Sequence, residues 1–288
     1  MIAVMGVTGQ VGGAIARKLL AEGEKVRVLV RSADKGETWK RAGAEIAVAS
    51  TDDTAALTRS FADTDAVFVM LPPVFDPAPG YPESAAATTS IRNALAAAKP
   101  GRVIALSTIG GQVDRDNLLI QLHHWERALR TLDLPVVFLR PTWFIENTQW
   151  LLADAREKGI FASHLQPLDK PVPMVAVDDI AATAADLLTR KDSTTGIVEL
   201  TGPQNVTPAE IASTLGRIFN REVRAQAIPR ERWDAEFRAA GMRHPEPRMR
   251  MLDGFNEGWI RFEATPRRGT TTLESALRRL ISRSTNEA

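Results

Sequence analysis

The feature that most constrains the fold of this chain is a glycine-rich loop close to its start. A short apolar run at residues 2–5 leads into Gly6-Val-Thr-Gly9-Gln-Val-Gly12, and residues 10–22 predict a helix. Between a strand and a helix, the first glycine permits a tight turn, the second lets the backbone approach a ligand, and the third lets the helix pack closely. The free amide groups and the positive dipole end of such a helix favour a phosphate group. The loop therefore predicts a site for the pyrophosphate of a dinucleotide, rather than a tight turn without a ligand.

The first half of the chain alternates predicted strands and helices. Apolar or β-branched runs predict strands at residues 2–5, 25–30, 45–48, 66–71, 102–107 and 136–140. Helices are predicted between them at residues 10–22, 34–42, 52–61, 82–98 and 116–131. This order is typical of a parallel sheet with helices on both faces, whose strands are buried and therefore apolar. We expect a Rossmann-type, doubly wound α/β sheet with a smaller C-terminal α/β lobe.

The second half of the chain is less regular. Helices are predicted at residues 146–158, 178–190, 208–219 and 230–240, and strands at 196–200 and 222–228. No composition shift marks a linker, so the two parts are expected to interleave. We expect residues 1–150 to form the dinucleotide-binding domain, with residues 176–202 returning to it. Residues 151–175 and 203–288 would then form a smaller lobe on the substrate side.

The end of the second predicted strand indicates which dinucleotide binds. An acidic residue there usually binds the ribose 2′-hydroxyl of NAD, whereas an arginine suits a 2′-phosphate. Arg31 stands at this position, and Lys35 could assist it. The alternative is that Arg31 is only a solvated residue after a strand. The sequence favours NADP(H) over NAD(H).

Composition and charge exclude several classes of function. The 288 residues hold 36 Lys and Arg against 35 Asp and Glu, a net charge of +1 that gives no electrostatic case for nucleic acid or a membrane surface. The chain has no cysteine, which excludes disulfides and thiolate metal sites. Because the glycine loop begins at Gly6, we expect no signal peptide. We expect a cytoplasmic protein without a bound metal, a monomer or homodimer, that acts on a small-molecule substrate.

Several motifs together resemble the NmrA-like family, whose members are atypical short-chain dehydrogenase/reductase proteins. The resemblance rests on the glycine loop, on Arg31-Ser32, on the segment Val-Phe-Val-Met-Leu-Pro-Pro that ends at Pro73, and on later stretches around Asp179 and Gly202. Its most specific mark is Arg140-Pro-Thr-Trp-Phe-Ile-Glu-Asn147. The family includes quinone, triphenylmethane-dye and imine reductases, and also NADP-binding redox sensors.

The resemblance implies a cofactor site at the ends of the strands. Its members would be Gly6, Thr8, Gly9, Gln10, Val11 and Gly12 around the pyrophosphate, Arg31 and Lys35 at the 2′-phosphate, Leu71 and Pro72 along the adenosine and ribose, Ser107 and Thr108 beside the nicotinamide, and Pro141, Thr142 and Phe144 near its carboxamide. One position departs from the pattern. Relatives often carry an Asp after the third strand that meets the adenine amine, and Ser50 stands about there.

The sequence lacks the tyrosine–lysine pair with which many members of the superfamily transfer a proton. Tyr81 is the only tyrosine; it lies in a proline-rich loop, and Ala85 stands four residues later. The helix after the fifth strand carries His123 and His124 instead. Family members often have Lys or His about one turn before the matching glutamate, a position that Leu122 occupies here. Either histidine could donate a proton or bind the ribose, or be a packed or solvated residue; with Thr108 they are the candidate catalytic residues.

Two functions fit these residues. The first is an NADPH-dependent reductase that transfers hydride to a small conjugated acceptor such as a quinone, which can take its protons from water. The second is a non-catalytic NADP(H)-binding redox sensor. Aromatic residues after the sixth strand could stack on a flat substrate or belong to the core: Trp143, Phe144, Trp150 and Phe161. Asp178 and Asp179 are expected to cap a helix, and the basic stretch 243–250 to be a solvated surface.

Overall fold

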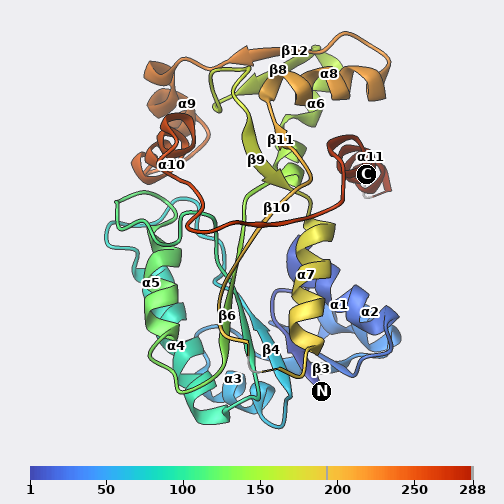
Figure 1. Ribbon diagram of the computed structural model, residues 1–288, viewed down its shortest axis with the longest axis vertical. Helices are drawn as coiled ribbons and strands as arrows, with labels where there is room; N and C mark the ends of the chain where they lie inside the picture. The colour runs from blue at the N-terminus through green and yellow to red at the C-terminus, as the bar shows by residue number, and fades with distance from the viewer. Residues whose placement is uncertain (193, 287–288) are drawn as a thin grey trace.

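A twisted parallel sheet forms the centre of the molecule in the computed structural model, which describes residues 1–192 and 194–286 (Figure 1). Within these residues it has eight strands in the order β13-β10-β6-β5-β4-β1-β2-β3, and all neighbours run parallel. The strands are β1 (Ile2–Val4), β2 (Val26–Val30), β3 (Glu45–Val48), β4 (Ala66–Val69), β5 (Val103–Leu106), β6 (Val136–Pro141), β10 (Gly196–Thr201) and β13 (Arg267–Arg268). The predicted doubly wound α/β sheet is confirmed.

Alternating side chains of each strand supply two cores on opposite faces of the sheet. In β1, Ile2 and Val4 join one core, and Ala3, followed by Met5, joins the other. The first core is covered by α1 (Gln10–Ala21) and α7 (Val177–Thr189), and the second by α3 (Thr54–Phe61), α4 (Pro82–Ala98) and α5 (Ile120–Leu129). Because these strands are buried on both faces, their sequences are almost continuously apolar.

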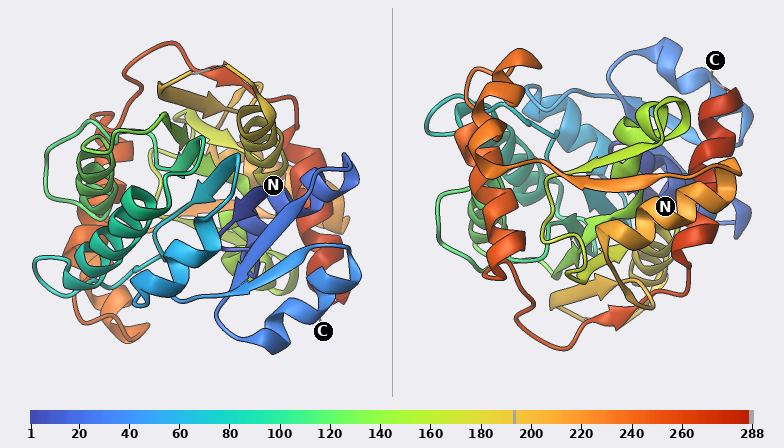
Figure 2. Two further views of the ribbon diagram at one scale, coloured as in Figure 1. Left: turned by 90° about the horizontal axis from the view of Figure 1, so that it is seen from below. Right: turned by 90° about the horizontal axis from the view of Figure 1, so that it is seen from above.

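The rest of the chain builds a lobe with its own apolar core at the carboxyl edge of the sheet (Figure 1). Its small sheets join β7 (Trp143–Phe144), β9 (Val172–Val175) and β11 (Asn205–Val206), and separately β8 (Ile160–Ser163) and β12 (Arg224–Ala227). Its helices are α6 (Leu152–Glu157), α8 (Pro208–Phe219), α9 (Trp233–Ala239), α10 (Glu246–Glu257) and α11 (Leu273–Asn286). Seen from above, α9 and α10 lie on one side of this end and α11 on the other (Figure 2).

Several elements differ from the sequence prediction. The predicted helix 34–42 is a 3₁₀ turn, Ala33–Gly36, followed by the short helix α2 (Glu37–Arg41). The predicted helix 146–158 is likewise a 3₁₀ segment, Ile145–Leu151, followed by α6, and residues 230–240 divide in the same way. These segments lack the sustained apolar period that holds a long α-helix against a core, so their first turns follow local contacts.

The helix predicted at residues 116–131 begins only at Ile120. The Asn117 side chain accepts a hydrogen bond from the Leu119 amide at 2.8 Å, and the Leu118 amide donates to Pro247 O at 2.8 Å. These bonds hold a turn in place of the first helical turn. No prediction covered α10, α11 or β13. The basic stretch 243–250, expected to be a solvated surface, contains the start of α10, and most of its side chains are half-buried. Within the described residues, no helix is long and apolar enough to cross a bilayer.

Candidate functional site

The glycine loop lies between β1 and α1, at the place where the strand order turns from β1 towards β2 on one side and β4 on the other. Ligands of doubly wound sheets bind outside the strand ends at this position. Gly6 has φ +70°, which favours glycine, and the Gly9 amide donates to Gly6 O at 2.9 Å. A Cβ on Gly12 would collide with the Met5 carbonyl, so only glycine lets α1 approach β1 this closely.

The start of α1 is open to an anion. Gly9 at the N-cap gives no side-chain hydrogen bond, and the first turn contains no acidic residue. Thr8 and Gln10 are exposed, whereas Val11 is buried and offers only its amide. An uncapped helix N-terminus with close backbone approach has the geometry that a pyrophosphate needs. The residues present therefore fit the phosphate groups of a dinucleotide.

Arg31 and Lys35 lie beyond the carboxyl end of β2, and both side chains are exposed. In the described part of the chain neither makes an ion pair. The Ser50 hydroxyl after β3 donates to Asp52, and this bond holds the pKa of the Asp52 carboxyl below its ordinary value. The Ser50 hydroxyl is thus already bonded within the chain. The nearest carboxylate, that of Asp52, stands two residues after the position at which an adenine-binding Asp was expected.

The other predicted cofactor residues lie at the same edge of the sheet. The Ser107 and Ile109 amides donate to Leu139 O and Pro141 O at 2.8 and 2.9 Å, so the segments that follow β5 and β6 lie side by side. Leu71 is packed in the core with Met5, whereas Pro72 is exposed. Within residues 1–192 and 194–286, the Thr108 hydroxyl has no hydrogen-bond partner, and neither does the Thr142 hydroxyl, which is buried. A buried hydroxyl without a protein partner needs a hydrogen-bond partner of another kind, such as water or a ligand.

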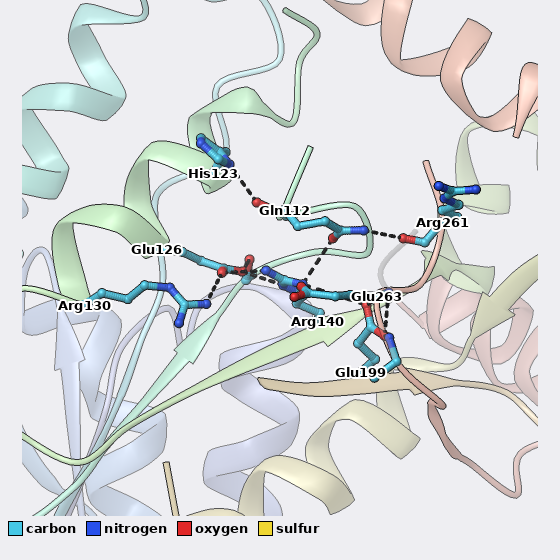
Figure 3. Close-up of polar contacts among 11 residues, drawn as sticks. Gln112, His123, Glu126, Arg130, Arg140, Glu199, Arg261 and Glu263 are labelled. Atoms are coloured by element: carbon cyan, nitrogen blue, oxygen red, sulfur yellow. Dashed lines mark hydrogen bonds and ion pairs between the residues drawn. The ribbon is translucent and has the colours of Figure 1, made fainter. Parts of the chain in front are cut away.

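A buried ion pair fixes the side of the site formed by β5, β6 and α5 (Figure 3). Arg140 at the end of β6 binds both oxygens of Glu126 on α5, and Glu126 also accepts the Ser107 hydroxyl at 2.6 Å. Burial alone would raise the pKa of Glu126, but the hydrogen bonds from Arg140 and Ser107 outweigh it and hold this pKa below its ordinary value. Glu126 therefore stays ionised and orients the Ser107 hydroxyl towards itself.

The same arginine ties the C-terminal segment to the sheet. Its Nη1 donates to Glu263 Oε2 at 2.7 Å and to Gln112 Oε1 at 3.1 Å, and Gln112 in turn donates to Arg261 O (Figure 3). Glu199 on β10 accepts the Glu263 amide at 3.0 Å. Sequence analysis missed this network, because Gln112 and Glu263, which bind Arg140, belong to no recognised motif.

Glu146, the acidic residue of the motif that begins at Arg140, also has a structural role. Glu146 Oε1 accepts the Val177 amide at the start of α7 at 3.0 Å, and burial raises the pKa of Glu146. The expectation that Asp178 and Asp179 cap α7 is wrong, since the N-cap is Ala176 and no side chain caps it. Asp179 instead accepts the Thr271 amide and hydroxyl, and Asp178 pairs with Arg279 and Arg283. Both carboxylates thus hold the segment that leads into α11.

The structure separates the two candidate histidines. His123 Nδ1 lies 3.0 Å from Gly111 O; because a carbonyl only accepts, Nδ1 carries the proton. Nε2 has no partner in the part of the chain that the structure describes, and His123 is half-buried beside the loop after β5. His124 is exposed and touches only the edge of the His123 ring, with centroids 5.8 Å apart. The geometry favours His123 over His124.

Tyr81 cannot replace the missing tyrosine. Its hydroxyl donates to Asp116 at 2.7 Å, away from the helix position that the superfamily uses. Burial and the Asp116 carboxylate raise the pKa of this phenol well above its ordinary value. The helix α5 contains neither tyrosine nor lysine.

Of the four aromatic residues weighed as substrate contacts, three belong to the core. Trp143 packs edge-on against Phe255, Phe144 lies against the sheet core, and Phe161 is buried. Trp150 alone of the four is exposed, at 59%. A separate pocket of about 320 Å³ lies between β11, α8 and the start of α11, and none of the predicted site residues lines it. Within the described residues, no group of three or more His, Asp or Glu side chains could hold a metal ion.

Comparison with known proteins places this arrangement among reductases. The chain is 28% identical over 228 residues to (4-alkanoyl-5-oxo-2,5-dihydrofuran-3-yl)methyl phosphate reductase of Streptomyces griseus, which covers 79% of this chain and 77% of that protein. It is 28% identical over 262 residues to NAD(P)H azoreductase of Xenophilus azovorans, with 89% and 85% covered. The crystal structure of an NADPH-dependent quinone oxidoreductase from Escherichia coli, complexed with NADPH, superposes with a TM-score of 0.82 at 21% identity and covers 98% of this chain and all of that one.

The model of the NmrA-like family matches residues 1–243, which is most of the chain. The match includes the glycine loop, the α5 histidines and the motif at Arg140. The resemblance seen in the sequence is thus confirmed, and the chain belongs to the NmrA-like family.

Proposed function

We propose that this member of the family, an NAD(P)H-dependent reductase, prefers NADPH and transfers its hydride to a small, flat, conjugated acceptor. The observation that carries the proposal is the start of α1. It combines an uncapped, acid-free first turn with a glycine, Gly12, at which any side chain would strike the backbone of Met5 and Gly6, directly after β1. Such an arrangement costs stability unless an anionic ligand uses it.

The preference for NADPH rests on Arg31. Its exposed guanidinium follows β2, where the adenosine ribose of a dinucleotide lies in this fold. Lys35 adds a second positive charge four residues later, and neither side chain forms an ion pair in the described part of the chain. Two cations without an ion pair can bind the negatively charged 2′-phosphate of NADPH. The neutral 2′-hydroxyl of NADH offers them no opposite charge.

The coenzyme would supply hydride, and the protein would position the acceptor and donate one proton to it. The reaction balances as NADPH, acceptor and one proton giving NADP⁺ and the reduced acceptor. His123 is the proposed donor of that proton. As an imidazolium it holds Nδ1–H on Gly111 O and offers Nε2–H; after donation it keeps the Gly111 bond as a neutral ring.

Ser107 and Thr108 would border the nicotinamide, and Thr142 would reach its carboxamide. The Ser107 hydroxyl donates a hydrogen bond to Glu126, so its oxygen can still accept a hydrogen bond from a ligand. The Thr142 hydroxyl is buried and unpartnered among the described residues, and can both donate and accept. These groups orient the ring, and their fixed positions lower the cost of reaching the reactive geometry.

The relatives support the class of acceptor. Their names give an acyl-furanone phosphate, an azo compound and a quinone as the compounds reduced. The three share an electron-accepting double bond in a conjugated system. Such an acceptor takes hydride without a strong acid, which agrees with the absence of a tyrosine–lysine pair from α5.

Purified protein mixed with NADPH and a panel of quinones, azo dyes and acyl-furanones tests the proposal through the loss of NADPH absorbance. We expect saturable oxidation that is faster with NADPH than with NADH. The alternative, a redox sensor, predicts binding without turnover and unequal affinities for NADP⁺ and NADPH, because a ligand shifts a conformation only through differential binding.

A further inference from the structure

Two large aromatic side chains are exposed on loops that neighbour the candidate site. Phe75 is 52% exposed and Trp150 is 59% exposed. They meet edge to face, with ring centroids 6.3 Å apart and an interplanar angle of 80°. The two residues come from different segments, the proline-rich loop after β4 and the 3₁₀ segment after β7, so their contact joins the two sides of the strand-end edge.

The residues on both sides of Phe75 are hydrogen-bonded to other parts of the chain. The carbonyl of Val74 accepts a hydrogen bond from Gln121 Nε2 on α5 at 3.3 Å, and Asp76 accepts the Arg243 and His244 amides at 2.9 and 2.7 Å. Prolines before and after it also limit the backbone. Phe75 is therefore held in an exposed position beside the N-terminal turn of α5, the helix that carries His123.

Trp150 is held from the opposite side. Its neighbour Gln149 accepts a hydrogen bond from Gln10, the first residue of α1, at 3.1 Å. Earlier in the same segment, Glu146 is bonded to the start of α7. The aromatic pair thus spans the space between the phosphate loop and the start of α5.

We infer that Phe75 and Trp150 form an aromatic clamp that stacks on the faces of a flat acceptor and makes the enzyme selective for acceptors of two or more fused rings. The inference rests on the proposed function. An acceptor that stacked on both rings would require one of them to turn from the present interplanar angle of 80°. It would replace one edge-to-face contact by two stacked contacts and would cover apolar surface that is now exposed. Phe75 comes from the loop that follows β4 of the main sheet and Trp150 from the segment that leads into the lobe, so the clamp lies where the two parts meet.

The coenzyme is the less suitable occupant of the clamp. Its adenosine end would lie towards β2, where Arg31 stands, and its phosphates would lie on the first turn of α1. The aromatic pair extends from that turn towards α5 and His123, the side on which the nicotinamide would lie. An acceptor above the nicotinamide would meet both rings.

The test compares the variants Phe75→Ala and Trp150→Ala with two probes, 1,4-naphthoquinone and the single-ring 1,4-benzoquinone. We expect each variant to raise the KM for naphthoquinone about 10-fold and to change that for benzoquinone much less. The KM for NADPH and the melting temperature should stay unchanged. Phe75→Tyr and Trp150→Phe should keep most of the wild-type selectivity. Val48→Ala, which truncates a 51% exposed side chain on the edge strand β3, is the matched control.

Naphthoquinone binding to the NADP⁺ complex is measured alongside, because this measurement needs no turnover. Wild type that reduces naphthoquinone while both alanine variants keep its KM would overturn the clamp and leave the proposed function intact. Wild type that binds naphthoquinone through these two residues without reducing it would support the clamp and contradict the proposed function. A change in the KM for NADPH instead of the quinone, or no quinone binding to wild type, would also overturn the clamp.

Discussion

Arg140 and Glu126 face each other through two parallel hydrogen bonds, Nε to Oε1 and Nη2 to Oε2, each 2.7 Å long. Both side chains are almost fully buried, and Glu126 also receives the Ser107 hydroxyl. A bidentate pair of this kind fixes direction as well as distance. The position of the site hydroxyl is therefore set by an ion pair that joins α5 to β6, and the C-terminal segment reaches the same arginine through Glu263.

Breaking this pair should destabilise the protein strongly. Arg140→Met leaves the Glu126 carboxylate buried without its partner, and we expect the free energy of unfolding to fall by about 3–5 kcal/mol. Arg130→Met is the control, because Arg130 contacts the same carboxylate at 3.2 Å from a side chain that is 47% exposed; its loss should cost less than about 1 kcal/mol. Urea denaturation measures both. Equal effects of the two variants would contradict a dominant role for the buried pair.

Arg31 should determine the choice between NADPH and NADH. Arg31→Ala removes a charge-assisted contact with the 2′-phosphate, which is worth about 1.5–3 kcal/mol, so the ratio of kcat/KM for the two coenzymes should fall about 10- to 100-fold. Activity with NADH should stay near its wild-type value. The control Lys25→Ala removes a cation that directly precedes the start of β2, at the end of the strand opposite to Arg31. It should leave this ratio unchanged. A preference for NADPH that survives in Arg31→Ala would place the 2′-phosphate elsewhere.

His123 and His124 should differ in their effect on turnover. His123→Ala removes the proposed proton donor and should lower kcat about 100-fold with acceptors that need a proton from the protein. His124→Ala removes an exposed neighbour and should leave kcat nearly unchanged. Quinones, which can take protons from water, should show the smaller loss. The same small effect for both variants on every acceptor would exclude His123 as the donor.

His164 gives the stability of the lobe a defined pH dependence. Burial, together with Arg248, lowers the pKa of His164 from 6.5 to about 4, although Glu236 lies 3.9 Å from its Nε2. Between these values the unfolded chain binds a proton that the native chain does not. The contribution of His164 to the free energy of unfolding therefore has its full value above about pH 6.5. It falls by roughly 3 kcal/mol as the pH drops towards about 4 and the unfolded chain takes up this proton.

The variant His164→Phe should remove this contribution and keep the packing. The ring is stacked on Phe237 at 4.9 Å and meets the edge of Trp233 at 5.4 Å, contacts that a phenyl ring can reproduce. We expect the free energy of unfolding of the variant to fall less than that of wild type between pH 7 and pH 4. Denaturant titrations at several pH values measure the difference, and parallel curves would show that His164 does not titrate in this way.

The sheet and its phosphate loop could be predicted because local rules fix them. The apolar run before Gly6, the spacing of Gly9 and Gly12 and the alternation of strands and helices each follow from backbone geometry and burial. The motif at Arg140 also identified the family. Its physical reason could not be read from the sequence, because the partners of Arg140 lie far away in the chain, as with Glu263.

The lobe was harder to predict because its contacts are mostly long-range. Asp179 stands where a helix cap is usual, yet it binds the Thr271 backbone, and only the fold brings the two together. The helix α10 was missed because its prolines and charges hide a short apolar face formed by Met251, Leu252 and Phe255. The pairing of Phe75 with Trp150 has no sequence signal at all, since one lies in a proline-rich loop and the other follows β7.

The most direct test of the central claim is a single-turnover experiment in which NADPH-loaded protein is mixed with a quinone, with deuterated NADPH as the comparison. The account predicts that each bound coenzyme reduces one quinone, and that deuterium at the transferred position slows the reaction. Tight binding of NADPH without oxidation by any acceptor would contradict the account and would identify the protein as a sensor of the coenzyme.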